Sequence, residues 1–148
     1  MEWVLLLNLA STGVMIGVIW FVQVVHYPLF GGVGSPGWTA YAAAHGRRTT
    51  LVVGPPMLLE LATSVLLALR PPPGIPPAAT WAGLALVAVV WASTGLLQVP
   101  RHRVLGGGWD AAAHRSLVAG NWVRTVAWTL RGMLVLWMLA RLLPTPGA

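Results

Sequence analysis

The sequence of 148 residues contains no cysteine and no lysine, and it has only three acidic residues. Without cysteine, the chain cannot form disulfides, thiolate metal sites, iron–sulfur clusters or covalently attached c-type haem. Charged residues make up 8% of the chain and hydrophobic residues 57%, whereas an average soluble domain is about 25% charged. This composition excludes an ordinary soluble domain. It also excludes a disordered chain, which needs low hydrophobicity and high charge. The sequence therefore predicts an integral membrane protein.

The formal net charge of +6 comes from nine arginines against Glu2, Glu60 and Asp110. A nucleic-acid-binding protein carries its basic residues on a polar surface, but most of the sequence around these arginines is apolar. We therefore expect no nucleic-acid partner. The expected partners are the lipid bilayer and a lipophilic small molecule. The sequence leaves open a homo-oligomer or a larger membrane complex.

Four apolar stretches are long enough to cross a bilayer as helices, which takes about 20 residues. They are residues 3–25, 51–69, 78–99 and 121–143. The first stretch lacks the basic residues and the cleavage pattern of a signal peptide, so we expect it to be a retained span. The prediction is an all-α, polytopic four-helix membrane bundle, a single domain over residues 1–148 with no clear internal repeat.

Two details of this bundle follow from the polar loops and the prolines. We expect short interfacial helices at residues 38–50 and 110–119, in the loops that join the first span to the second and the third to the fourth. Gly54-Pro55-Pro56 lies near the start of the second span. Because proline lacks a backbone donor and clashes with the preceding turn, a kink or break is expected there.

The arginines predict the orientation of the bundle. Five of them lie in the two polar loops, namely Arg47, Arg48, Arg101, Arg103 and Arg115, whereas the opposite side has Arg70 and Arg141. Short loops rich in arginine stay in the cytoplasm. We expect a bacterial inner-membrane protein with both termini outside.

Polar side chains gather at the cytoplasmic end of the predicted bundle. They include all four histidines of the chain. The candidate site residues at this end are His26, Tyr27, His45, Gln98, His102, His114, Asn121 and Arg124. Because helix direction alternates, the topology brings them to one face of the bundle.

Two charges lie deeper, since Glu60 is near the middle of the second span and Arg131 near the middle of the fourth. A charge in mid-membrane costs several kcal/mol unless it is paired or faces water. Glu60 therefore needs a partner, and either Arg131 or Arg124 can supply it. Asn121, Arg124, Trp128 and Arg131 follow steps of three and four residues, so this stripe should face the bundle interior.

The histidines and carboxylates suggest a cofactor or an enzyme site. Nitrogen and oxygen ligands suit Fe, Zn or Cu, and helix bundles hold such metals between facing helices. The expected metal ligands are His26, His102, His114 and Glu60. Two histidines could instead bind b-type haem, or histidine and Glu60 could act as acid and base on a lipophilic substrate. The catalytic candidates are Glu60, His26, Asn121 and Arg124, and the cofactor-binding candidates are His45, Gln98, Arg131 and Tyr27.

Two other functions stay open at this point. A small transporter or proton-relay protein could use Glu60, His26 and a helix broken at Gly54-Pro55-Pro56, as transporters build sites from freed backbone groups. A non-catalytic accessory subunit of a membrane complex is the third reading.

Three short segments resemble a family of small bacterial four-helix membrane proteins. They are His26-Tyr27-Pro28-Leu29-Phe30, Gln98-Val99-Pro100-Arg101-His102 and Asn121-Trp122-Val123-Arg124-Thr125. The Asn-x-x-Arg pattern that opens the last span is similar to the DUF1772, anthrone oxygenase-like proteins. This resemblance implies oxygenation of a polycyclic aromatic, without an established cofactor. It makes Asn121 and Arg124 the residues to which a family role would transfer.

Overall fold

The computed structural model describes residues 1–143, and every regular element in that range is a helix. The long helices are α1 (Glu2–Phe21), α2 (Ser35–Leu69), α3 (Pro77–Ser93) and α5 (Ala111–Ala140). Shorter elements are η1 (Val22–His26), η2 (Pro28–Gly32), η3 (Thr94–Gln98) and α4 (Val99–Gly106). Since η1 and η2 extend α1, and η3 and α4 extend α3, the chain forms four long rods.

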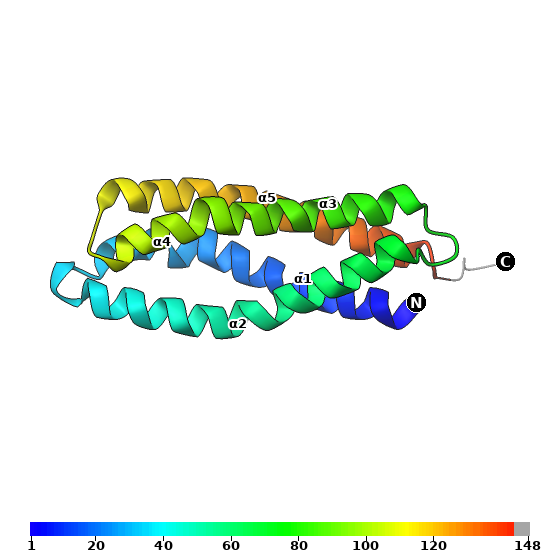
Figure 1. Cartoon of the computed structure of the whole chain (residues 1–148), viewed down its shortest axis with the longest axis horizontal. Coiled ribbons are helices and arrows are strands. Elements are labelled where there is room, and N and C mark those ends of the chain that lie inside the picture. The colour runs from blue at the N-terminus through cyan, green and yellow to red at the C-terminus, as the bar shows by residue number, and fades with distance from the viewer. Residues whose placement is uncertain (144–148) are drawn as a thin grey trace.

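The four rods form an up-and-down bundle (Figure 1). Helix α1 packs against α2 and α5, and α3 packs against the same two helices, so α1 and α3 lie diagonally opposite each other. The start of α1 and the end of α5 lie at one end of the bundle. The α1–α2 and α4–α5 connections lie at the other end, which carries the five loop arginines and is called here the arginine-rich end.

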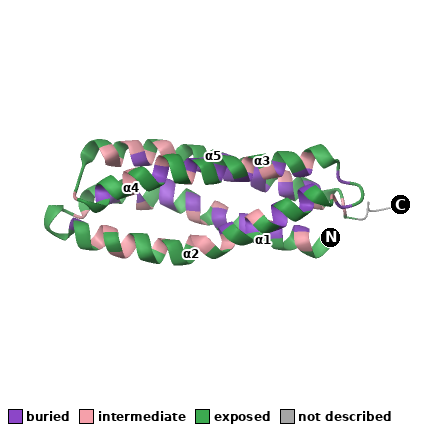
Figure 2. Cartoon of the chain, viewed as in Figure 1, coloured by how far each residue is buried: buried purple, intermediate pink, exposed green. Residues whose placement is uncertain are grey.

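Four helical stretches are long and apolar enough to span a membrane, as the sequence predicts. The outer surface is also apolar, because large side chains such as Leu51, Leu69 and Leu136 are exposed. Exposed residues cover the outer faces along the bundle and buried residues lie between the helices (Figure 2). An exposed apolar surface of this extent is suited to lipid. The chain is an integral membrane protein with a helical bundle fold.

The helices run further than the sequence predicts. The segments expected to form separate interfacial helices, 38–50 and 110–119, are instead parts of α2 and α5, which continue into the spans. Hydropathy marks the stretch that suits the bilayer, but a helix ends only where its backbone changes conformation. Gly34, with φ of 79°, precedes α2, and Asp110 caps α5 by accepting a hydrogen bond from Ala113 N at 2.8 Å.

Helix α2 continues without a break through Pro55 and Pro56. Its axis changes direction near its middle (Figure 1), so the expected kink is present and the expected break is not. A proline inside a helix bends it but need not end it when neighbouring helices hold both parts. The freed backbone that a transporter-like site needs is therefore not provided here by a break in α2.

Two further prolines, Pro28 and Pro100, each follow a turn of π-helix. η1 is followed two residues later by Pro28, and η3 is followed two residues later by Pro100. Each π turn adds one residue to the helical turn, which leaves room for the proline ring. The guanidinium of Arg101 donates 2.7 Å to the carbonyl of Leu97 beside Pro100. The two halves of the chain thus share one local structure, a π turn followed two residues later by proline, which the sequence alone did not reveal.

The bundle interior alternates between apolar and polar layers along its length. An apolar cluster of Leu5, Leu67, Ile75, Val135 and Met138 lies at the end that holds the termini. A second apolar cluster contains Met15, Ile19, Met57, Val90, Ala127 and Trp128 and lies at mid-bundle. A third contains Val22, Tyr27, Phe30, Trp38, Leu105 and Leu117 and lies at the arginine-rich end. One polar layer separates each pair of neighbouring clusters.

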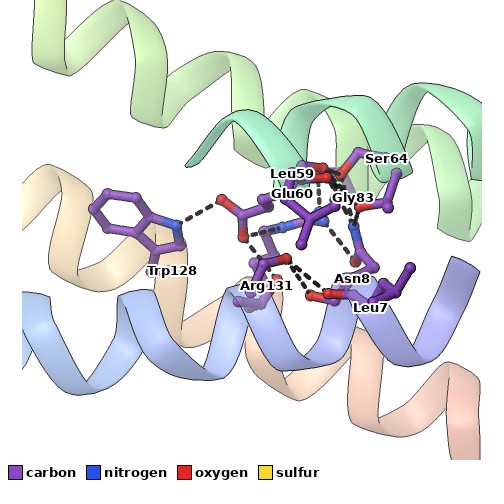
Figure 3. A network of polar contacts seen from close by, with 11 residues as sticks. Leu7, Asn8, Leu59, Glu60, Ser64, Gly83, Trp128 and Arg131 are labelled. Carbon is purple, nitrogen blue, oxygen red and sulfur yellow. Dashed lines mark hydrogen bonds and ion pairs between the residues drawn. The ribbon is translucent and has the colours of Figure 1, made fainter. Parts of the chain in front are cut away.

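The deeper polar layer centres on the ion pair of Glu60 and Arg131 (Figure 3). Arg131 Nε donates to Glu60 Oε1 at 2.8 Å, and both side chains are almost fully buried. Thr12 Oγ1 donates to the same Oε1 at 2.7 Å, and Trp128 Nε1 donates to Oε2 at 2.9 Å. The carboxylate therefore has a hydrogen-bond donor on each oxygen, as a buried charge requires.

The remaining donors of Arg131 reach the other helices. Nη2 donates to Asn8 Oδ1 at 2.8 Å and to Ser64 Oγ at 2.6 Å, and Nη1 donates to the carbonyl of Gly83 at 2.6 Å. A side chain at Gly83 would place its Cβ 3.1 Å from Nη1, so the glycine allows the guanidinium to approach. Helices α1, α2, α3 and α5 all contribute to this network, which holds the bundle together.

We predict that removing one member of the pair destabilises the fold strongly. Arg131→Met leaves Glu60 as a buried charge without its counter-ion, which should lower the free energy of unfolding by about 3–5 kcal/mol. Arg115→Met, on the exposed part of the same helix, is the matched control and should change little. Thermal unfolding in detergent, followed by circular dichroism, measures both.

The double variant tests the pairing itself. Because Glu60→Met together with Arg131→Met leaves no lone charge, its cost should be well below the sum of the two single costs. Additive costs would contradict an ion pair that acts as one unit.

Candidate functional site

A cavity of about 280 Å³ lies in the polar layer nearer the arginine-rich end. Its polar lining comes from Tyr27, His45, Thr49, Thr50, Thr94, Gln98, His102 and Arg124. Its apolar walls include Phe30, Trp38, Val53, Val99 and Leu105. The two π turns position Tyr27 and Gln98 in this layer, since Tyr27 directly follows η1 and Gln98 is the last residue of η3.

Tyr27 joins a histidine to an arginine within the cavity. Its hydroxyl lies 2.9 Å from His102 Nε2 and accepts a hydrogen bond from Arg124 Nη2 at 3.3 Å. Because the tyrosine oxygen accepts from arginine, its own hydrogen is available for the histidine nitrogen. A proton can therefore pass between Tyr27 and His102 next to a fixed positive charge.

Arg124 is buried but has only neutral partners. Its Nε donates to Asn121 Oδ1 at 3.0 Å, and Nη1 lies 3.5 Å from Thr94 Oγ1. Asn121 is itself held by Gln23, whose Oε1 accepts from Asn121 Nδ2 at 2.8 Å. Within residues 1–143 the one ion pair of arginine with a carboxylate is that of Glu60 and Arg131. The guanidinium of Arg124 thus brings a charge to the cavity that no side chain in this range neutralises.

Gln98 is a second buried polar side chain at the cavity. Its side chain is 1% exposed and lines the cavity, yet in the described part of the chain neither its Oε1 nor its Nε2 has a hydrogen-bond partner. Leaving a buried amide unsatisfied costs about 1–3 kcal/mol per group. The cavity wall therefore holds a buried amide whose donor and acceptor both lack a partner within residues 1–143.

The four histidines gather at this end, as predicted, but they do not form one set. His26 Nε2 lies 2.9 Å from His45 Nδ1, and the ring of His45 stacks on that of His102 with 5.4 Å between centroids. His114 lies apart from this group and contacts the carbonyl oxygen of Tyr27 at 2.8 Å. His26, His45 and His102 therefore form one group, of which His45 and His102 line the cavity.

These positions bear on the expected metal or haem. Among residues 1–143 no three His, Asp or Glu side chains are placed to share a metal ion. His45 and His102 face each other as stacked rings, whereas two axial haem ligands point their nitrogens at a common iron. These residues do not fit either group as placed, so we derive no step through one. The metal or haem remains a prediction, which metal analysis and a search for a Soret band test.

The other predicted site residues divide between the two polar layers. Asn121 and Arg124 belong to the cavity layer, and Glu60 pairs with Arg131 in the deeper layer, which confirms one of the two predicted partners. The whole stripe from Asn121 to Arg131 is buried, also as predicted. Glu60 and the histidines thus lie in different networks, so the structure does not bring together the proposed metal set or a relay from Glu60 to His26.

Several residues of these networks were not singled out from the sequence. Asn8, Thr12 and Gln23 interrupt the apolar run of the first span, and all three are buried against partners on other helices. Their spacing carried the signal, because Asn8 and Thr12 are four residues apart and so share a helix face. A polar residue inside a span is best treated as a network member.

The fold and this site define a membrane-embedded four-helix bundle with a polar cavity near one end. No family model matches the chain, and neither a curated protein nor a solved structure matches it.

We predict opposite effects for two amide side chains of this layer. Gln98→Met has nearly the same shape and removes an unsatisfied amide, so it should leave the stability of the ligand-free protein unchanged or raise it by about 1–3 kcal/mol. Asn121→Leu removes the partner of both Arg124 and Gln23 and should lower it by a similar amount. Thermal unfolding compares the two, and a large loss for Gln98→Met would show that its amide has a partner.

Proposed function

We propose that the cavity binds a lipophilic molecule by an oxygen-bearing end and that the Tyr27–His102 pair transfers a proton on that molecule. The observation that carries the proposal is the joint presence of a buried, un-neutralised Arg124 and an unpartnered Gln98 in one cavity. A buried charge without a counter-ion is costly. A ligand with a negative or strongly polarised oxygen would remove that cost.

The chemistry follows from the order of the groups. When a substrate loses a proton, negative charge develops on its oxygen, and a fixed guanidinium stabilises that charge without reorganising. The amide of Gln98 can donate a second hydrogen bond to the same oxygen. His102, in hydrogen-bond contact with the Tyr27 hydroxyl, is the proton acceptor that this arrangement favours.

The walls of the cavity favour a flat, apolar substrate body. Phe30, Trp38 and Leu105 are part of its lining, and aromatic walls stack on planar rings. The resemblance to anthrone oxygenase-like proteins supports the same substrate class, a polycyclic aromatic. In this proposal the deprotonated substrate is an electron-rich anion and molecular oxygen is the oxidant, so the activity is oxidoreductase-like.

The place of the site in the cell is also part of the proposal. The cavity lies toward the arginine-rich end, and the positive-inside rule assigns such an end to the cytoplasm. A lipophilic substrate would reach it from the bilayer, in a bacterial inner membrane with both termini outside.

The proposal is tested with dihydroxyanthrone and its dimethyl ether on the purified full chain in detergent. Binding is followed by tryptophan fluorescence and turnover by oxygen uptake. The phenol should bind at least about tenfold more tightly than the ether, because only the phenol carries phenolic hydroxyls that can ionise next to Arg124, whereas the acidic ring C–H is common to both compounds. Arg124→Gln should remove this preference.

Oxygen uptake distinguishes the role of Tyr27 from that of Arg124. Tyr27→Phe should reduce oxygen uptake roughly a hundredfold, in the range of a lost proton-transfer group, and leave binding of the phenol nearly unchanged. Arg115→Gln, at an exposed residue that does not line the cavity, is the control. Equal binding of phenol and ether in the unaltered protein would contradict the proposal. Binding without oxygen uptake would contradict its enzymatic part.

A further inference from the structure

A second hollow lies on the outer side of the bundle, between α1 and α2. This groove has a volume of about 400 Å³ and an almost entirely apolar lining. Gly17, Val18 and Phe21 line it on α1, and Val52 and Val53 line it on α2. Gly17 contributes to the hollow by having no side chain, and a Cβ built there would meet no atom within 4 Å.

The groove continues into an adjoining hollow at the arginine-rich end, which titratable side chains border. This adjoining space has a volume of about 260 Å³ and shares His26, Arg48 and Thr49 with the groove. Tyr41 and His45 complete its polar lining. The two hollows together form one amphipathic site, apolar toward the bundle middle and cationic toward the end.

The length of the groove matches one leaflet of the bilayer. From Gly17 to His26 the first rod advances about 14 Å at about 1.5 Å per residue, close to half of a roughly 30 Å hydrocarbon core. The apolar part therefore spans the depth of the acyl chains in one leaflet, with Arg48 and His26 at headgroup level.

The charge at this level selects the headgroup. Arg47 and Arg48 are exposed side by side on α2. None of the three acidic residues lies at the groove, since Glu60 is in the deep network, Asp110 caps α5, and Glu2 begins α1 at the other end. Basic pockets between membrane helices bind anionic lipid headgroups.

We propose that this groove binds one anionic phospholipid, with an acyl chain along α1 and α2 and the headgroup phosphate at Arg48 and His26. The site is distinct from the cavity of the proposed function, although the two adjoin: His45, Thr49 and Val53 line both, and His26 and Arg48 line the lipid site alone. Lipid binding here would fix α1 against the kinked part of α2.

The test measures lipid binding to the full chain in detergent by native mass spectrometry. The probes are phosphatidylglycerol, phosphatidylcholine with the same acyl chains, and water-soluble glycerol phosphate. Phosphatidylglycerol should bind about fivefold more tightly than phosphatidylcholine, the effect of one arginine near a charged headgroup. Glycerol phosphate should not compete, because it lacks the chain that the groove binds.

Matched variants on the same helices locate the site. Arg48→Gln should remove the preference for phosphatidylglycerol, whereas Arg47→Gln, outside the lining, should retain it. Gly17→Leu should fill the groove and weaken both lipids, whereas Gly13→Leu, one turn away and equally open, should not. Thermal unfolding without lipid checks that each variant folds. Equal affinity for both lipids, competition by glycerol phosphate, or unchanged binding in Gly17→Leu would overturn the proposal.

Discussion

The ion pair of Glu60 and Arg131 is the constraint on which the rest of the bundle depends. Its partners come from all four long helices, so the register of each helix is fixed by a polar contact at one depth. A lipid-exposed bundle has little hydrophobic force between its helices, and interhelical hydrogen bonds and close packing take its place. Glycine at position 83 shows how closely the pieces fit, since the guanidinium occupies the space that a side chain would fill.

Two arginines on one face of α5, Arg124 and Arg131, differ in their partners, and this difference distinguishes the two polar layers. Arg124 and Arg131 are two turns apart on α5, and both are buried. The deeper one has a carboxylate partner, whereas the other has only Asn121, Tyr27 and Thr94. The mid-bundle apolar cluster separates the two layers. The deep layer therefore pairs its charges within the fold, whereas the outer layer holds an arginine with neutral partners in residues 1–143.

The sequence predicts the spans, the polar end and the deep pair for clear physical reasons. Length and hydropathy define a span. Glu60 is the one acidic residue near the middle of a span, where it can form an ion pair with a mid-membrane arginine. Hydropathy could not show that α2 continues through Pro55 and Pro56, because backbone continuity depends on the packed neighbours. Nor could it show that the Gln98 amide has no hydrogen-bond partner within residues 1–143, since that depends on which atoms the π turn brings near. The sequence also could not show that Glu60 is separate from the histidines. Their positions in the sequence do not reveal at which depth along the bundle each side chain lies.

We propose that the cavity beside Arg124 is a ligand site and not a packing defect. An experimental density map of the protein purified from its own membrane tests it most directly. A bound ligand should give density larger than a water molecule within hydrogen-bond distance of both the Arg124 guanidinium and the Gln98 amide. A cavity closed by neighbouring side chains, with the Gln98 amide bonded to the protein itself, would contradict it.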